Sequence, residues 1–149
     1  FEAGCFDIAW TVQMQMNIAD KSALYTEIAR VLKPGGVLVF QDIVQGPGGA
    51  LHLPVPWASK PAHSYLMTPE ELRAIITASG FETTVWRDMT AAHKEWTRKL
   101  AAREAPPVPG PVGIHMVLGD DAFEKRRNSA RCLMEDRIGF VQGVFKKPE

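Results

Sequence analysis

The chain has 149 residues, of which 46% are hydrophobic and 23% are charged, and its formal net charge at pH 7 is zero. A chain of this length and balance is expected to form one compact domain, residues 1–149. The neutral charge gives no general attraction to nucleic acid or to anionic lipid, and no apolar run reaches the roughly 20 residues that span a bilayer. Since no secretory signal pattern is seen either, we expect a cytoplasmic protein with neither nucleic acid nor a membrane as its partner.

The first third of the sequence predicts, in order, a strand at 6–10, a loop at 11–16, a helix at 20–32 and a strand at 37–42. Both strands are mostly apolar runs of the kind found in buried sheets. Asp20 is a good N-cap for the helix, in which apolar residues recur at helical spacing. The Lys-Pro-Gly-Gly run at 33–36 is expected to end the helix before the second strand.

Residues 45–67 form a long segment that is rich in glycine and proline. A segment of this length without regular structure is uncommon inside a compact domain, and it is usually a lid or a binding loop. Its aromatic and aliphatic residues argue against disorder. We therefore predict a loop or lid at 45–67.

The remainder predicts helices at 68–80, 90–103 and 120–135, strands at 81–87 and 137–146, and a Pro-rich extended linker at 105–113. The clearest local signature belongs to the first of these helices, where Thr68 is the N-cap, Pro69 takes the first helical position and Glu71 completes a capping box. The linker is interpreted as a spacer between helices. The basic run at 125–127 is interpreted as a solvated helix face.

The two cysteines, Cys5 and Cys132, lie far apart, with no CxxC spacing and no neighbouring histidine. This pattern predicts neither a disulfide framework nor a metal site. Two free, buried thiols are expected instead.

The order of the elements predicts an α/β fold. Helices that connect the early strands require right-handed crossovers and a largely parallel sheet. The direction of the last strand is not determined by the pattern. In sheets of this kind the ligand lies at the carboxyl ends of the strands, which places residues 10–13 and 41–43 at the expected site.

Residues 6–42 resemble the middle of the class I S-adenosylmethionine-dependent methyltransferases. The resemblance depends on Phe-Asp-Ile-Ala-Trp at 6–10, Asp20-Lys21, and Ala-Arg-Val-Leu-Lys-Pro-Gly-Gly at 29–36, and it continues through 68–72 and 79–81. It implies a partial Rossmann-like methyltransferase sheet flanked by helices, with strands 4-5-7-6 of the family order 3-2-1-4-5-7-6. Residues 54–58 and 139–143 look most like the small-molecule branch, near the sarcosine and dimethylglycine N-methyltransferases.

The resemblance implies S-adenosyl-L-methionine as the cofactor. In the family, the turn after the fourth strand lies along the methionine part of the cofactor, so by position the cofactor-binding residues are Trp10, Thr11, Val12 and Gln13. An ordinary strand-end turn is the alternative. The family's glycine-rich loop and its ribose-binding acid have no counterpart in the sequence, which begins at Phe1 rather than Met. We therefore expect the C-terminal part of a methyltransferase domain, inactive and poor at binding the cofactor by itself.

The acceptor side has fewer sequence signals. Asp42 is a candidate for substrate contact or proton acceptance, although a carboxylate at a strand end can also simply cap the next turn. Ile43, Trp57 and Tyr65 are candidate substrate-binding residues, and the two aromatic residues could equally form the core of the loop. His63, like His52, is a candidate base, with an ordinary surface histidine as the alternative. His93 and His115 are given no role.

Two functions remain open from the sequence. The first is an S-adenosylmethionine-dependent methyltransferase that acts on a small molecule, with amines among the candidate acceptors. The second is a non-catalytic fragment or subunit that acts as a binding or dimerisation module. In both cases the strand at 6–10 would be an apolar sheet edge, which invites pairing with another strand. We expect self-association or pairing with the missing N-terminal half.

Overall fold

The computed structural model describes residues 1–102, 112–113 and 115–149. Its strands are β1 (Phe6–Val12), β2 (Leu32–Gln45), β3 (Glu82–Asp88) and β4 (Ile138–Lys146). Its helices are α1 (Lys21–Val31), α2 (Pro69–Ala78), α3 (Thr90–Ala101), α4 (His115–Leu118) and α5 (Ala122–Met134), with short 3-10 turns at Gln15–Asn17 and Pro61–His63. Most of the predicted linker at 105–113 lies outside the described residues. No helix in the described part of the chain is both long and apolar enough to cross a membrane.

The four strands form one sheet in the order β1-β2-β4-β3. β1 and β2 are parallel, whereas β4 runs antiparallel to both of its neighbours, β2 and β3. Three strands therefore share one direction and the last strand is reversed. This is the 4-5-7-6 arrangement that the resemblance implies, so the predicted fold class is confirmed.

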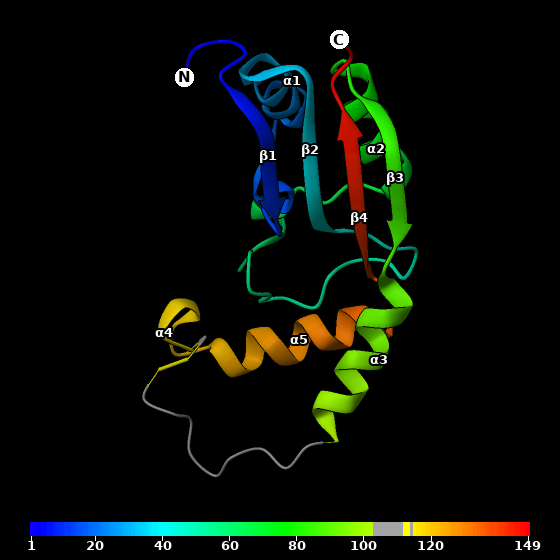
Figure 1. The fold of residues 1–149 in the computed structure, drawn as a ribbon. Coiled ribbons are helices and arrows are strands. Elements are labelled where there is room, and N and C mark those ends of the chain that lie inside the picture. The colour runs from blue at the N-terminus through cyan, green and yellow to red at the C-terminus, as the bar shows by residue number, and fades with distance from the viewer. Residues whose placement is uncertain (103–111, 114) are drawn as a thin grey trace.

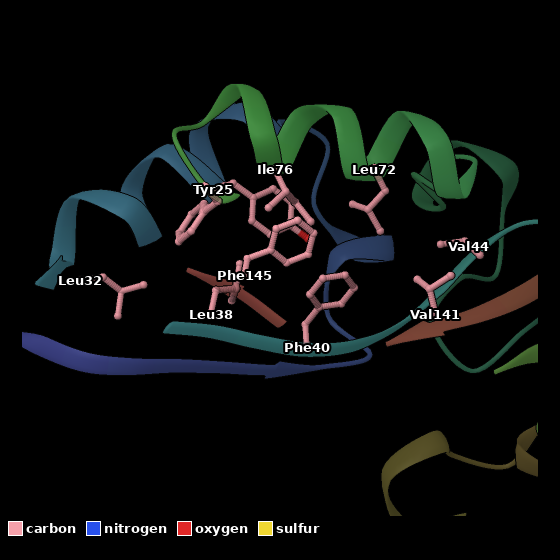
Figure 2. Packing of buried hydrophobic residues seen from close by; sticks show 10 residues of the cluster. Tyr25, Leu32, Leu38, Phe40, Val44, Leu72, Ile76, Val141 and Phe145 are labelled. Atoms are coloured by element: carbon pink, nitrogen blue, oxygen red, sulfur yellow. The ribbon is translucent and has the colours of Figure 1, made fainter. Parts of the chain in front are cut away.

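One face of the sheet is covered by α1 and α2 (Figure 1). Figure 2 shows the core between them, in which Leu72 and Ile76 of α2 lie over Phe40 of β2 and Phe145 of β4. The rings of Phe40 and Phe145 are stacked, with their centroids 5.8 Å apart. Because side chains alternate along a strand, the even-numbered residues of β2 from 38 to 44 point into this core and the odd-numbered ones point to the opposite face.

The two predicted N-caps, Asp20 and Thr68, are confirmed. The Asp20 side chain accepts a hydrogen bond from the Ala23 backbone N–H at 2.8 Å. Thr68 and Glu71 form a capping box at the start of α2, with the Glu71 backbone N–H donating to the Thr68 hydroxyl at 3.3 Å. These caps satisfy N–H groups that the first turn of a helix leaves without partners.

β2 is longer than the predicted strand at 37–42, because it continues to Gln45 and begins at Leu32, and so includes the run at 33–36 that the sequence indicates as a helix stop. Two contacts explain the difference. The Gly35 backbone N–H donates to the Lys147 carbonyl at 3.0 Å, and the Lys147 N–H donates to the Gly36 carbonyl at 2.8 Å. These bonds pair the end of the chain with the two glycines and bring them into the strand, although Gly35 keeps a turn conformation with a φ of +73°.

The segment between β2 and α2 is packed against the body of the protein. Val55 and Ala58 are buried in a second core cluster with Ile43 of β2 and Leu133 of α5. Trp57 and Leu66 pack against the edge of this cluster. The apolar residues of the predicted loop therefore anchor it to the sheet and to α5.

The cysteine expectation holds for only one of the two thiols. Cys132 is buried and free. Cys5 is also free but is exposed, because it immediately precedes β1, an edge strand of the sheet.

Candidate functional site

The tip of β1 is open to solvent on one face. The exposed fractions of Ile8 and Trp10 are 64% and 73%, and both lie on the face opposite α1 and α2. Thr11 points the other way, and its hydroxyl is buried with no hydrogen-bond partner among the described residues. Gln13 continues the pairing with β2, since its N–H donates to the Gln41 carbonyl at 2.8 Å.

Asp42 is buried completely on the α1 side of the sheet. Its Oδ1 accepts hydrogen bonds from the Met14 N–H at 2.8 Å and from the Gln15 N–H at 3.2 Å. Burial raises the pKa of Asp42 to about 6, although these N–H groups and the Lys21 ammonium act in the opposite direction. Asp42 therefore holds the turn that follows β1, and its side chain points away from the cavity described next.

A cavity of about 1420 Å³ lies beyond the carboxyl ends of β1 and β2, between the sheet and α3–α5. The sheet side is formed by Gln13, Ile43 and Phe140, and the long loop contributes Trp57. Two helix faces form much of the rest of the wall, together with residues at 16, 17, 56, 117 and 118. The lining residues at 93, 96, 97, 100 and 101 of α3, and at 123, 126, 127, 130 and 133 of α5, follow the spacing of a single face on each helix.

His93 is the titratable residue on the sheet side of this cavity. Its ring stacks on Phe140, with the ring centroids 3.8 Å apart and the planes 6° from parallel. Its Nε2 lies 3.3 Å from Nε2 of Gln41 on β2. Burial lowers the pKa of His93 below its usual value of 6.5. The ring is therefore neutral near pH 7 and can exchange hydrogen bonds with a bound molecule.

His93 had no predicted role, although the sequence contains one signal for it. His93 shares a helical face with Trp96, Thr97 and Leu100, and a face that combines one imidazole with apolar residues can line a site. That face could not be assigned to a cavity without the position of α5, which lies far away in the sequence.

The structure brings only some of the predicted residues together. Gln13, Ile43 and Trp57 line the cavity, and the Trp57 indole N–H donates to the Ser64 hydroxyl at 3.0 Å. The predicted residues that do not line it are Trp10, Thr11, Val12, Asp42, His63 and Tyr65. His52 also lies elsewhere, 2.7 Å from the carboxylate of Glu135.

The tip of β1 fits one side of the cofactor that the resemblance implies. Trp10 and Val12 offer exposed apolar surface, and Gln13 turns toward the cavity. These groups suit the methionine part of the cofactor. The turn from β1 into α1 has no glycine in the sequence, so it is not the phosphate- or ribose-cradling type of loop.

Comparison with known proteins places these features in context. A family model described as a methyltransferase domain matches residues 1–40. Dimethylglycine N-methyltransferase of Parasynechococcus marenigrum is 29% identical over 84 residues, which cover 56% of this chain and 30% of that protein. The chain spans less than half the length of the curated relatives it matches.

Solved structures share the fold. Phosphoethanolamine N-methyltransferase 2 of Haemonchus contortus, in complex with S-adenosyl-L-methionine, matches with a TM-score of 0.72 and 19% identity over 100% of this chain and 35% of that chain. The [4+2]-cyclase SpnF matches with a TM-score of 0.66 and 24% identity over 99% of this chain and 52% of that chain. A methyltransferase and a cyclase thus share this architecture, so the fold alone does not determine the reaction.

Proposed function

We propose, from the membership of this chain in the class I S-adenosylmethionine-dependent methyltransferases, that it forms the acceptor side of an enzyme that methylates a small molecule. One observation supports this most strongly. The large cavity opens beside Gln13, at the carboxyl ends of the parallel strands β1 and β2, where ligands bind in open α/β sheets. The cavity favours an enzyme over a module that only binds a partner.

Within this proposal, Trp10, Thr11, Val12 and Gln13 contact the methionine side of the cofactor. S-Adenosyl-L-methionine, when bound, supplies a methyl group that is already activated on a sulfonium. The work of the chain is then mainly to align the acceptor, because an oriented pair of reactants reacts far faster than a free one. Asp42 contributes indirectly, since its carboxylate holds the backbone of residues 14 and 15 and so fixes the adjacent Gln13.

The acceptor lies in the cavity, against Ile43 and Trp57 on one side and the face of α3 on the other. His93 and Gln41 form the polar pair on the sheet side. A neutral His93 can accept a hydrogen bond from an acceptor hydroxyl or amine, or donate one to it, and the stacking on Phe140 holds the ring in place. Similarity to a dimethylglycine N-methyltransferase, whose name indicates methylation of an amine, favours an amine acceptor.

We also propose that another polypeptide segment covers β1. One edge of β1 pairs with β2, and in the described part of the chain no strand lies beside the opposite edge. The exposed apolar residues Ile8 and Trp10 adjoin this edge, a combination that favours strand pairing. The greater length of the curated relatives supports the rest of a methyltransferase domain as the covering segment. In the isolated chain, a second copy of the chain would cover this edge instead.

A chimera tests the proposed function. Residues 1–149 would replace the matching part of dimethylglycine N-methyltransferase, and binding of S-adenosylhomocysteine would be measured by calorimetry. We expect the folded chimera to bind the ligand, a Gln13→Ala chimera to bind it more weakly, and the isolated chain to bind it poorly. A folded chimera without affinity, or micromolar binding by the isolated chain, would contradict the proposal.

Light scattering and hydrogen exchange test the covered edge. We expect the isolated chain to form dimers or larger species, with slow exchange of the β1 amides on the unpaired side. A Trp10→Lys variant should shift the chain toward monomer, because a charge on an edge strand opposes pairing. Arg87→Lys, on the opposite edge strand β3, is the matched control. A monomer with fast-exchanging β1 amides would refute this part of the proposal.

A further inference from the structure

The basic run on α5 separates into two kinds of side chain. The flanking cations are paired along the helix, Lys125 with Asp121 at 2.8 Å and Arg131 with Glu135 at 2.7 Å. Arg126 and Arg127, which lie between them, form no ion pair or hydrogen bond with any described residue. Both arginines are exposed, so the direction in which their face of α5 points decides what they can contact.

Both arginines line the cavity. They belong to the face of α5 that also presents Phe123, Ala130 and Leu133 to it, whereas the paired cations Lys125 and Arg131 do not line it. No aspartate or glutamate is found among the cavity-lining residues that the structure describes. The wall on the α5 side therefore carries positive charge without a compensating acid.

The opposite wall is apolar. Trp96 and Leu100 of α3 face the cavity, and Figure 1 shows α3 and α5 lying beyond the end of the sheet at which β1 terminates. An apolar body can pack against this wall and lose contact with water. The planar guanidinium of arginine is suited to two-point hydrogen bonding with a carboxylate or a phosphate.

We infer that the methyl acceptor has an apolar or aromatic body and an oxyanion, and that Arg126 and Arg127 bind the oxyanion. This inference rests on the proposed function and specifies its substrate class. With the oxyanion held by α5, the body of the acceptor lies along α3 and its other end reaches the sheet side, near Gln13 and His93. Two-ended attachment of this kind provides the alignment that methyl transfer requires.

Calorimetry on the chain itself tests the inference with three probes that share one ring system: 2-naphthylacetate, 2-naphthyl phosphate and 2-(2-naphthyl)ethylammonium. We expect both anions to bind at least about tenfold more tightly than the cation, because the guanidinium groups form charge-assisted hydrogen bonds with an anion and none with an ammonium group, which has no acceptor. The tighter of the two anions identifies the carboxylate or the phosphate as the preferred group. Added salt should reduce the preference for the anions.

The variants Arg126→Ala and Arg127→Ala, singly and together, should weaken binding of the anions and leave binding of the cation unchanged. Arg98→Ala removes the same charge from α3 at a position that does not line the cavity and is the matched control. Equal or tighter binding of the cation, no binding of any probe, or full retention of anion binding in the double variant would overturn the inference. Each of these results can occur whether or not the chimera binds S-adenosylhomocysteine, so the two proposals fail separately.

Discussion

The imidazole of His93 stacks on the ring of Phe140, with the ring centroids 3.8 Å apart. The contact joins the first turn of α3 to the antiparallel strand β4, and it places a titratable ring on the wall of the cavity. A side chain that sequence reasoning set aside is thereby fixed at the site by a residue far away in the chain. Its ionisation is accessible to measurement.

We expect His93 to titrate below pH 6.5. Burial against Phe140 penalises the charged imidazolium, which lowers the pKa in the folded protein from 6.5. The contribution of His93 to stability is therefore present above pH 6.5 and is lost as the pH falls through the folded-state pKa. Proton NMR of the histidine ring protons, assigned with a His93→Gln variant, gives the value directly.

Phe140→Ala should move the midpoint of His93 back toward 6.5, because water then reaches the ring. Trp96→Ala changes a different part of the cavity wall and is the control. A midpoint at or above 6.5 in the unmodified chain would contradict the geometry. It would also remove the neutral hydrogen-bonding role that we propose for His93.

A second prediction concerns Asp42 and the stability of the fold. Its pKa is raised from 3.8 to about 6, chiefly by burial. A carboxyl group with a raised folded-state pKa favours the native state below pH 3.8, and this contribution is lost as the pH rises through 6. Two pKa units correspond to roughly 3 kcal/mol. Asp42→Asn should remove this contribution. Between pH 4 and pH 6.5, the free energy of unfolding of the variant should therefore decline less than that of the unmodified chain.

The measurement is urea unfolding of the two proteins across that pH range. The difference between the curves isolates Asp42, because other groups titrate in both proteins. Glu135, for example, has a pKa lowered to about 2 by His52, Arg131 and Arg137, and it contributes to both curves equally. Parallel curves would show that Asp42 is solvated in the folded chain.

Local sequence patterns predicted the helices well because their signals are local. Asp20 and Thr68 cap helices through contacts to residues three positions later. The order of the strands came from the family resemblance, since periodicity alone does not indicate which strands are neighbours. The direction of β4 depends on pairing with β2 and β3, and it cannot be predicted from the pattern of its own nine residues.

The parts that could not be predicted depend on contacts between distant residues. Gly35 has the positive φ of a turn, +73°, as the local pattern indicates, but the pairing of Gly35 and Gly36 with Lys147 places both glycines within β2. Asp42 was a reasonable candidate for a ligand contact at a strand end. The alternation of side chains places it on the core side, while its neighbour Ile43 faces the cavity.

The capping box of α2 provides a third prediction. Thr68→Ala removes the hydroxyl that accepts from the Glu71 N–H, so the free energy of unfolding should fall by about 1 kcal/mol. Thr68→Ser keeps an acceptor at this position and should retain most of the stability. Urea unfolding at neutral pH distinguishes the two variants. Equal losses would mean that the hydroxyl does not cap the helix in solution.

The close approach of the long loop to the turn between α5 and β4 provides the last prediction. A Cβ atom at Gly48 would lie 2.1 Å from the carbonyl oxygen of Glu135, and a Cβ at Gly49 would meet only the end of the flexible Arg137 side chain, at 3.9 Å. Gly49 has a φ of +95°, so Gly49→Ala introduces backbone strain of about 1–2 kcal/mol.

Gly48→Ala should be the more damaging substitution, with a loss on the order of 3 kcal/mol, because the backbone segments themselves must separate. The same separation would break the hydrogen bond from the Gly48 N–H to the Asp136 carbonyl, which is 2.8 Å long, and would loosen the loop that carries Trp57 to the cavity. Thermal unfolding of both variants, together with quenching of tryptophan fluorescence, measures the two effects. If Gly49→Ala proved the more destabilising, the loop would not lie against this turn. The position of Trp57 on the cavity wall would then be wrong as well.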